Sequence, residues 1–141
     1  MSREYPDRPW VGVVAVVRRG AEFLLVERGQ EPHRGWWGFP GGVQHLGETL
    51  EEAAARELSE ETGVCAAAPR VLTAFDAIER GLEGRVRRHF ALVAVGFTWI
   101  SGEGAAADDA AAVGWFRLDA LGALKVLPRV AEVMGRALDL G

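Results

Sequence analysis

The sequence predicts an α+β domain in which helices cover both faces of a β-sheet. Residues 11–17 are a nearly unbroken run of β-branched and small apolar residues, and residues 22–27 form a second run. Such continuous apolar runs are typical of strands that are buried on both faces. Residues 49–62 and the segment after Pro128 instead place their apolar residues at helical spacing. The length of 141 residues, of which 49% are hydrophobic, fits a single domain over 1–141 with a core of its own.

The order of the elements follows from the same patterns. The first two runs are predicted to form a hairpin that turns near Gly20, and the Gly-, Pro- and Trp-rich segment 29–42 is predicted to be a loop with a short strand at 36–39. Thr49 and Glu52 have the spacing of a capping box, and Gly63 stands where a helix ends, so 49–62 is the clearest helix. The other predicted elements are strands at 71–75, 86–97 and 114–118, a turn at 79–84, a flexible loop at 101–112 and a terminal helix after Pro128.

Charge and composition narrow the class of protein. The net charge of −4 disfavours a general nucleic-acid-binding protein, which would be expected to be basic, but it allows an anionic substrate if a cation lies between substrate and protein. The chain starts without an apolar signal segment and has no apolar run long enough to span a bilayer, so we expect a cytoplasmic protein with no membrane partner. The single cysteine, Cys65, cannot form an internal disulfide, and its apolar neighbours predict a buried thiol.

The predicted helix at 49–62 carries two glutamates on the side that should face the core. With Leu50 and Leu58 on the apolar face, Glu57 and Glu61 fall about 20° to either side of Leu50 at roughly 100° per residue. Burying several carboxylates together is unfavourable unless a positive charge compensates them. Carboxylate oxygens suit Mg²⁺, so the pattern indicates a divalent-cation site. The alternative is a solvated acidic face on a Glu-rich helix.

The spacing of residues around this helix matches a known motif. Gly42 is followed after five residues by Glu48, and Glu48 after seven residues by the segment Arg56–Val64, which reads RELSEETGV. This arrangement resembles the Nudix box, G-x5-E-x7-R-E-U-x-E-E-x-G-U with U aliphatic, at every position. The lead-in Trp37–Gly42 and the acidic pair Asp108–Asp109 are also similar to the family pattern. The resemblance implies a mixed β-sheet sandwiched between helices, an α/β/α arrangement, with the box as loop–helix–loop.

The resemblance to the Nudix family also implies a metal site. Glu57, Glu60 and Glu61 resemble the carboxylates that bind Mg²⁺ in the family, and the main-chain carbonyl of Gly41 resembles a further ligand. Mn²⁺ is an alternative cation. A bound cation would neutralise the oxygens of a diphosphate and polarise its phosphorus toward attack by water.

The catalytic residues implied by the resemblance are Glu57, Glu61, Arg56 and Asp109. Arg56 and Glu48 look like a supporting pair that orients the acidic cluster, although the same two charges could form an ordinary surface ion pair of little energetic value. A carboxylate must accept the proton of the attacking water. Glu57 on the helix and Asp108 or Asp109 on the loop are the candidates.

Substrate-binding residues are predicted just before the box. Trp36 could stack on a nucleotide base, Phe39 lies in the lead-in to the box, and Arg28 could contact a phosphate. The neighbouring Trp37 could also stack, but it is expected to pack in the core, and the competing interpretation of Arg28 is an ordinary surface charge.

Overall the chain resembles short bacterial Nudix proteins described as ADP-ribose pyrophosphatases, which implies hydrolysis of ADP-ribose to AMP and ribose 5-phosphate. The proline that a better-defined ADP-ribose class carries downstream of the box is missing from residues 71–95. Two alternatives stay open: a nucleoside triphosphate pyrophosphohydrolase of the sanitising type, and a nucleotide-binding sensor without catalysis. The expected partner is a nucleotide substrate, and the resemblance also implies a homodimer.

Overall fold

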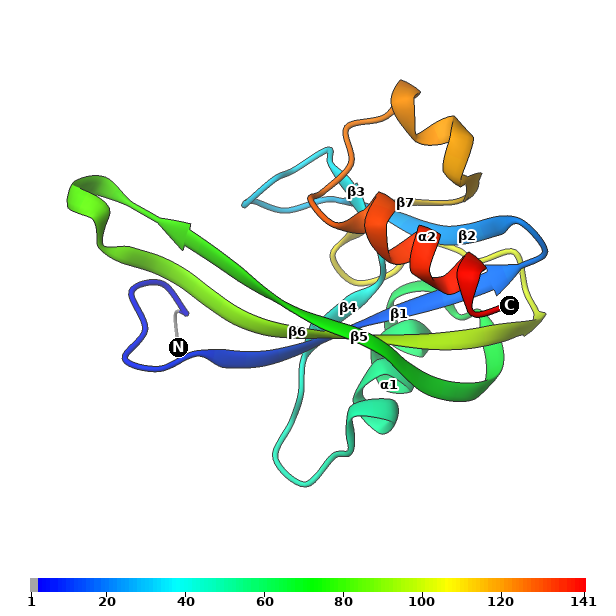
Figure 1. Cartoon of the computed structure of the whole chain (residues 1–141), viewed down its shortest axis with the longest axis horizontal. Helices are drawn as coiled ribbons and strands as arrows, with labels where there is room; N and C mark the ends of the chain where they lie inside the picture. Colours follow the sequence, from blue (N-terminus) through cyan, green and yellow to red (C-terminus); the bar gives the residue numbers. More distant parts are fainter. Residues whose placement is uncertain (1–2) are drawn as a thin grey trace.

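A mixed seven-stranded sheet forms the centre of the computed structural model, which describes residues 3–141 (Figure 1). Two α-helices flank the sheet, and two short 3₁₀ helices lie at 82–84 and 118–123. The elements in chain order are β1 (Trp10–Arg19), β2 (Glu22–Arg28), β3 (Trp37–Gly38), β4 (Gly41–Val43), α1 (Leu50–Thr62), β5 (Cys65–Arg80), β6 (Val86–Ser101), β7 (Ala110–Arg117) and α2 (Val130–Asp139).

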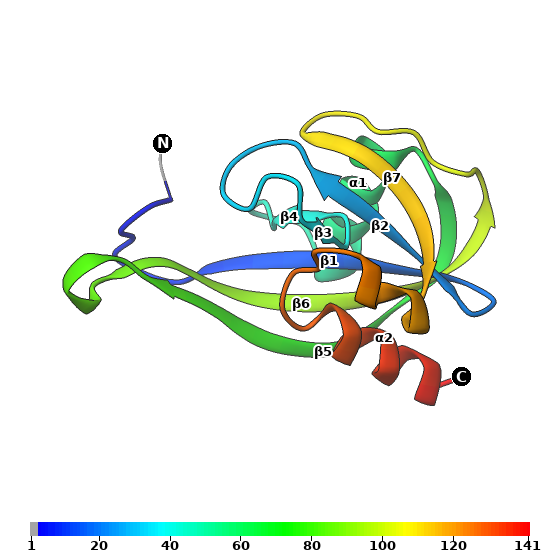
Figure 2. The same ribbon diagram turned by 90° about the horizontal axis from the view of Figure 1, so that it is seen from above.

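Both parallel and antiparallel pairs occur in the sheet. β1 and β6 pair in parallel from Trp10↔Phe90 to Arg18↔Thr98, whereas β5 and β6, β2 and β7, and β1 and β2 are antiparallel. β1 and β2 form the predicted hairpin, which turns at Gly20 with φ of +62°. β4 pairs with the first half of β1, on the edge opposite β6, and Figure 2 shows β2 and β7 curving away from β1, β6 and β5.

The two faces of the sheet carry separate apolar clusters, as the continuous apolar runs predicted. Alternate residues of β1 point to opposite faces, so Val13 contributes to one cluster and Val16 to the other. The cluster under α1 consists of Val13, Ala15, Val17, Leu24, Ala53, Ala54, Leu58, Val64, Val95 and Phe97. The cluster under α2 consists of Val16, Phe23, Leu25, Ala94, Leu121, Val130, Val133, Met134 and Ala137. The predicted mixed sheet between helices is therefore confirmed.

Helix α1 begins and ends as its sequence predicts. The Glu52 amide donates to Thr49 Oγ1 at 3.1 Å, and the Thr49 amide donates to Glu52 Oε1 at 2.9 Å, which completes the capping box. Gly63 ends the helix in the left-handed region with φ of +69°. Neither α1 nor any other helix within residues 3–141 is long and apolar enough to cross a bilayer.

The structure corrects several predicted boundaries. β5 starts at Cys65 instead of residue 71 and extends to Arg80, because pairing with β6 outweighs the weak strand preference of its alanines. Pro69 is tolerated because β5 is an edge strand. Cys65 is exposed, so the expectation of a buried thiol is wrong. The short β4 was not predicted, since Gly41 and Gly42 give no strand signal of their own.

Candidate active site

The carboxylates of α1 lie against the two glycines of β4. Glu61 Oε2 accepts a hydrogen bond from the Gly41 amide at 2.9 Å. The Glu57 carboxylate occupies the space beside Gly42, where an added Cβ would lie 2.5 Å from Glu57 Oε1. At Gly41 an added Cβ would collide with the main chain of Val13, so β4 can approach β1 this closely only with glycine there. The two glycines therefore let main chain and carboxylates meet.

Glu61 is a strongly perturbed acid. Burial, together with the hydrogen bond and the charge of Glu57, raises the pKa of Glu61 to about 8, against the lowering effect of the Gly41 amide. The charge of Asp108 acts in the same direction as that of Glu57. Glu61 therefore keeps its proton at neutral pH unless a cation replaces it. This behaviour is typical of functional sites.

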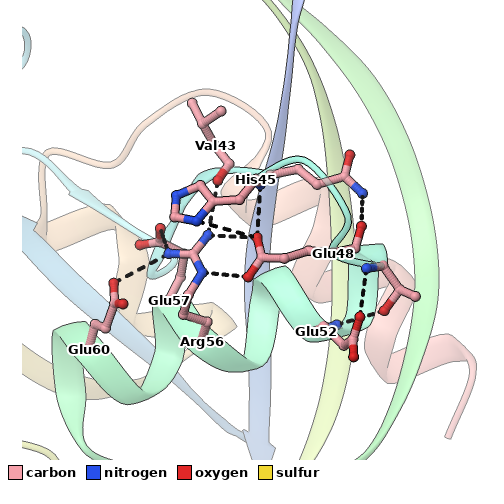
Figure 3. A network of polar contacts seen from close by, with 9 residues as sticks. Val43, His45, Glu48, Glu52, Arg56, Glu57 and Glu60 are labelled. Carbon is pink, nitrogen blue, oxygen red and sulfur yellow. Dashed lines mark hydrogen bonds and ion pairs between the residues drawn. The ribbon is translucent and has the colours of Figure 1, made fainter.

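Arg56 connects the helix to the loop that precedes it (Figure 3). Its Nε and Nη2 donate to the two carboxylate oxygens of Glu48 at 2.6 and 3.0 Å, which is a bidentate pair. Nη2 also donates to the Val43 carbonyl at 3.1 Å. Nη1 donates to Glu57 at 2.8 Å and to Glu60 at 3.3 Å. One guanidinium thus contacts the loop, the half-buried carboxylate of Glu57 and the exposed carboxylate of Glu60.

Glu48 is held in its ionised form by the same network. The hydrogen bond from Arg56 is the largest cause that lowers the pKa of Glu48 to about 2, and the His45 amide adds a second hydrogen bond at 2.8 Å. Gln44 Nε2 donates to the Glu48 carbonyl at 2.7 Å. Val43 and His45 contribute through main-chain atoms, which any residue type supplies, and for that reason the sequence did not single them out.

The carboxylate oxygens are suitable ligands for a divalent cation, but the side chains do not converge on a single position. Within residues 3–141, no three His, Cys, Asp or Glu side chains converge as the ligands of a single ion would. Arg56 turns Glu60, whose side chain is 49% exposed, and one oxygen of Glu57 toward itself. Glu57, at 14% exposure, and Glu61 form a half-buried acidic pair beside the Gly41 amide. Mg²⁺ in place of the proton of Glu61 would compensate the negative charges of the two carboxylates.

The loop between β6 and β7 brings an acidic residue to this pair. The Ala107 amide donates to the Glu61 carbonyl at 3.1 Å, and Asp108 follows with φ of +52°. Asp109 instead uses its carbonyl to accept from the Gly29 amide at 2.9 Å. Asp108 is therefore the loop carboxylate whose charge acts on Glu61, and main-chain hydrogen bonds join the loop to the end of α1.

The predicted substrate-binding residues lie around the loop between β2 and β3. Arg28 Nε donates to the Pro32 carbonyl at 2.7 Å, so this guanidinium closes the loop on itself. Trp36 lines an open groove of about 690 Å³ formed with the segment that leads into α2. Phe39 is half-buried against the apolar cluster under α2. The three residues thus contact the β2–β3 loop and the α2 side of the sheet, whereas the acidic pair belongs to α1.

Gly42→Ala tests whether Glu57 needs its place beside β4. The new methyl group would collide with the Glu57 carboxylate. Because the backbone of Gly42 is not in the left-handed region, alanine adds no backbone strain of its own. We expect an affinity for Mg²⁺ that is lower by roughly tenfold to a hundredfold, because the side chain must turn away. Titration of Mg²⁺ by calorimetry measures this effect. Gly122→Ala, where an added Cβ meets nothing within 4 Å, is the matched control.

Comparison with known proteins agrees with this geometry. The family model described as "NUDIX domain" matches residues 7–139, so the chain belongs to the NUDIX domain family. An "ADP-ribose pyrophosphatase" of Methanocaldococcus jannaschii is 34% identical over 113 residues, which are 80% of this chain and 64% of that protein. The chain thus spans less than two thirds of the length of this relative.

Solved structures share the fold over nearly the whole chain. The MutT NUDIX hydrolase from Burkholderia pseudomallei has a TM-score of 0.80 and 29% identity, covering 92% of this chain and 98% of that one. A bifunctional NMN adenylyltransferase/ADP ribose pyrophosphatase from Francisella tularensis, complexed with AMP and a Mn ion, has a TM-score of 0.70 and 28% identity. That match covers 94% of this chain and 42% of the bifunctional one.

Proposed function

We propose that this protein is a Mg²⁺-dependent hydrolase that splits the diphosphate bond of ADP-ribose into AMP and ribose 5-phosphate. The observation that carries the proposal is the half-buried pair Glu57–Glu61, in which the pKa of Glu61 is raised and which Arg56 and the main chain of β4 hold in place. The choice of ADP-ribose is supported by the names of the Methanocaldococcus and Francisella relatives.

The residues that would hold the cation are Glu57, Glu60, Glu61 and the main-chain carbonyl of Gly41. Bound Mg²⁺ or Mn²⁺ would neutralise the diphosphate oxygens and make phosphorus more open to attack by water. Glu61 must give up its proton when the cation binds. Glu60 must turn from Arg56 toward Glu61, and its exposure of 49% leaves it free to do so.

The proton of the attacking water needs an acceptor, and we assign this role to Asp108. Asp108 is exposed on the loop next to Glu61, so it is open to water, whereas Glu57 is engaged by Arg56. A carboxylate that is open to water can accept the proton of the attacking water directly. Asp109, which the resemblance placed among the catalytic residues, keeps its neighbour in place through its main-chain bond to Gly29.

Recognition of the nucleotide is assigned to the groove beside Trp36. Its indole forms one wall, and Lys125 and Arg129 line the same groove, which suits an aromatic base with a nearby phosphate. Arg28 and Phe39 act by holding the walls, because Arg28 closes the loop on Pro32 and Phe39 packs in the core.

The experiment that tests the function is hydrolysis of a nucleotide panel with Mg²⁺ and with EDTA, using a coupled phosphatase. The panel holds ADP-ribose, NADH, nucleoside triphosphates, dinucleoside polyphosphates and sugar nucleotides. We expect ADP-ribose to be hydrolysed fastest, with AMP as product and no turnover in EDTA. Faster hydrolysis of triphosphates, releasing pyrophosphate, would instead support the sanitising type. An absence of hydrolysis in Mg²⁺ and Mn²⁺ would point to a nucleotide sensor.

Binding of Mg²⁺ should release a proton. Because the pKa of Glu61 is raised to about 8 without a cation, Glu61 is protonated at pH 7 and must ionise to bind Mg²⁺. We therefore expect about one proton released per Mg²⁺ at pH 7, and an affinity that rises about tenfold per pH unit up to roughly pH 8. Calorimetry in buffers of different ionisation enthalpy measures the proton. An affinity independent of pH between 6 and 8 would contradict the raised pKa of Glu61.

A further inference from the structure

Two tryptophans hold the start of the loop that carries Asp108. Trp99 on β6 donates from Nε1 to the Gly102 carbonyl at 2.8 Å. Trp115 on β7 donates from Nε1 to the Glu103 carbonyl at 2.9 Å. The two indoles face each other edge to face with centroids 6.3 Å apart. They therefore fix the main chain where the loop leaves the sheet.

Arg19, at the end of β1, adds a charge to this pair of indoles. Its guanidinium carbon lies 4.0 Å from the centroid of Trp115 and 5.1 Å from that of Trp99, which is cation–π geometry. The same guanidinium forms ion pairs with Glu103 on the loop and with Glu22 at 3.3 Å. We call Arg19, Trp99, Trp115 and Glu103 the Arg19 clamp. Its members come from three strands and from the loop itself.

The loop then follows the C-terminal end of α1 to Asp108. Residues 104–107 read GAAA, so this stretch has no polar side chain with which to fix itself. Its main chain bonds to the last carbonyls of the helix, from Ala105 to Thr62 at 3.0 Å and from Ala107 to Glu61 at 3.1 Å. These two bonds also satisfy helix carbonyls that have no partner within α1. The path from the clamp to Asp108 is thus set by main-chain bonds alone.

We propose that Arg19, Trp99 and Trp115 are positioning residues for hydrolysis, because the Arg19 clamp holds the loop that places Asp108 beside Glu61. The inference rests on the proposed role of Asp108 as proton acceptor. Ordering a segment of glycine and alanine costs conformational entropy, and its small side chains make too few contacts to offset that cost. Without the clamp, the two bonds to α1 would have to order the loop alone, and Asp108 would spend less time in position.

The test is a double-mutant cycle between Arg19 and Asp108, measured on the fastest substrate of the panel. Arg19→Gln should lower kcat roughly tenfold with KM within about twofold, because a misplaced proton acceptor affects the reaction and not substrate binding. Arg19→Lys keeps the charge over the indoles and should recover most of kcat. In an Asp108→Asn background, Arg19→Gln should have no further effect on kcat. Arg117→Gln, which removes an exposed ion pair with Asp119 on the same sheet, is the matched control.

The outcomes separate the two levels of the proposal. If Asp108→Asn lowers kcat but Arg19→Gln lowers it by the same factor in both backgrounds, Asp108 stands and the clamp inference is overturned. If Asp108→Asn keeps the kcat of the wild type, the proposed proton acceptor is wrong and the inference falls with it.

Hydrogen exchange provides a measurement that needs no activity. The amides of Ala105 and Ala107 should exchange at least about tenfold faster in Arg19→Gln than in the wild type, while the amides in the middle of α1 stay unchanged. Trp115→Phe keeps an aromatic ring but removes the hydrogen bond to the Glu103 carbonyl, and it should speed exchange at the same two amides. It serves as the second variant if Arg19→Gln does not fold. Unchanged exchange at both alanines would overturn the clamp.

Discussion

Glu61→Gln should lower kcat at least about a hundredfold, which corresponds to roughly 3 kcal/mol in the activation barrier. Glutamine keeps the size of the side chain and can still accept from the Gly41 amide, but it has lost the charge that would face the cation. The loss should appear in kcat at saturating Mg²⁺ as well as in the Mg²⁺ affinity. Steady-state kinetics with ADP-ribose over a range of Mg²⁺ concentrations measures both.

The same variant should not be less stable than the wild type in the absence of metal. The pKa of Glu61 is raised on folding, so its contribution is most favourable below its ordinary pKa and becomes unfavourable as pH rises toward 8. Glutamine has no such penalty, so the Tm of the metal-free variant at pH 8 should be equal or higher. A lower Tm together with lower activity would mean that the variant simply unfolds.

Glu51→Gln is the matched control for this change. Glu51 lies in the first turn of the same helix, outside the acidic pair, so its charge should matter little to turnover. A value of kcat within about twofold of the wild type is expected. Near-wild-type activity in Glu61→Gln would show that the cation is held by other residues.

The layers of the fold could be predicted from the sequence because a continuous apolar run indicates a strand that is buried on both faces. The adjacent residues Val16 and Val17 are buried on opposite faces of β1, and a nearly continuous apolar run is typical of a strand that is covered on both faces. The helical spacing of Leu50 and Leu58 likewise predicted which side of α1 faces the sheet. Glu57 lies on that side with only 14% of its side chain exposed.

Other parts of the site depend on residues that are distant in the sequence or on main-chain atoms. β4 is a strand only because it pairs with the first half of β1, since its glycines have no strand preference. The loop at 102–109 looks flexible by composition, but indole and main-chain bonds from Trp99, Trp115 and α1 fasten it. Such contacts leave no periodic signal, so the order of this loop could not be predicted.

Arg56→Lys should reduce the affinity for Mg²⁺ roughly tenfold to a hundredfold and lower kcat/KM by a similar factor. Arg56 contacts both oxygens of Glu48, one oxygen of Glu57 and the Val43 carbonyl. The three hydrogens of a lysine ammonium diverge from a single nitrogen, so lysine keeps the charge but cannot match this planar fork. Glu57 would lose the contact that fixes its orientation beside Gly42.

This substitution separates the two interpretations of the Arg56–Glu48 pair. If the pair were an ordinary surface ion pair, lysine would serve nearly as well, and the exchange would cost at most about 1 kcal/mol in stability. The side chains of Arg56 and Glu48 are only 21% and 19% exposed, so their geometry should matter more than charge alone. Arg117→Lys is the control, because Arg117 also contacts both oxygens of an aspartate, Asp119, but at 60% exposure. Mg²⁺ titration and kinetics that are unchanged in Arg56→Lys would show that the charge of residue 56, and not its shape, supports the acidic pair.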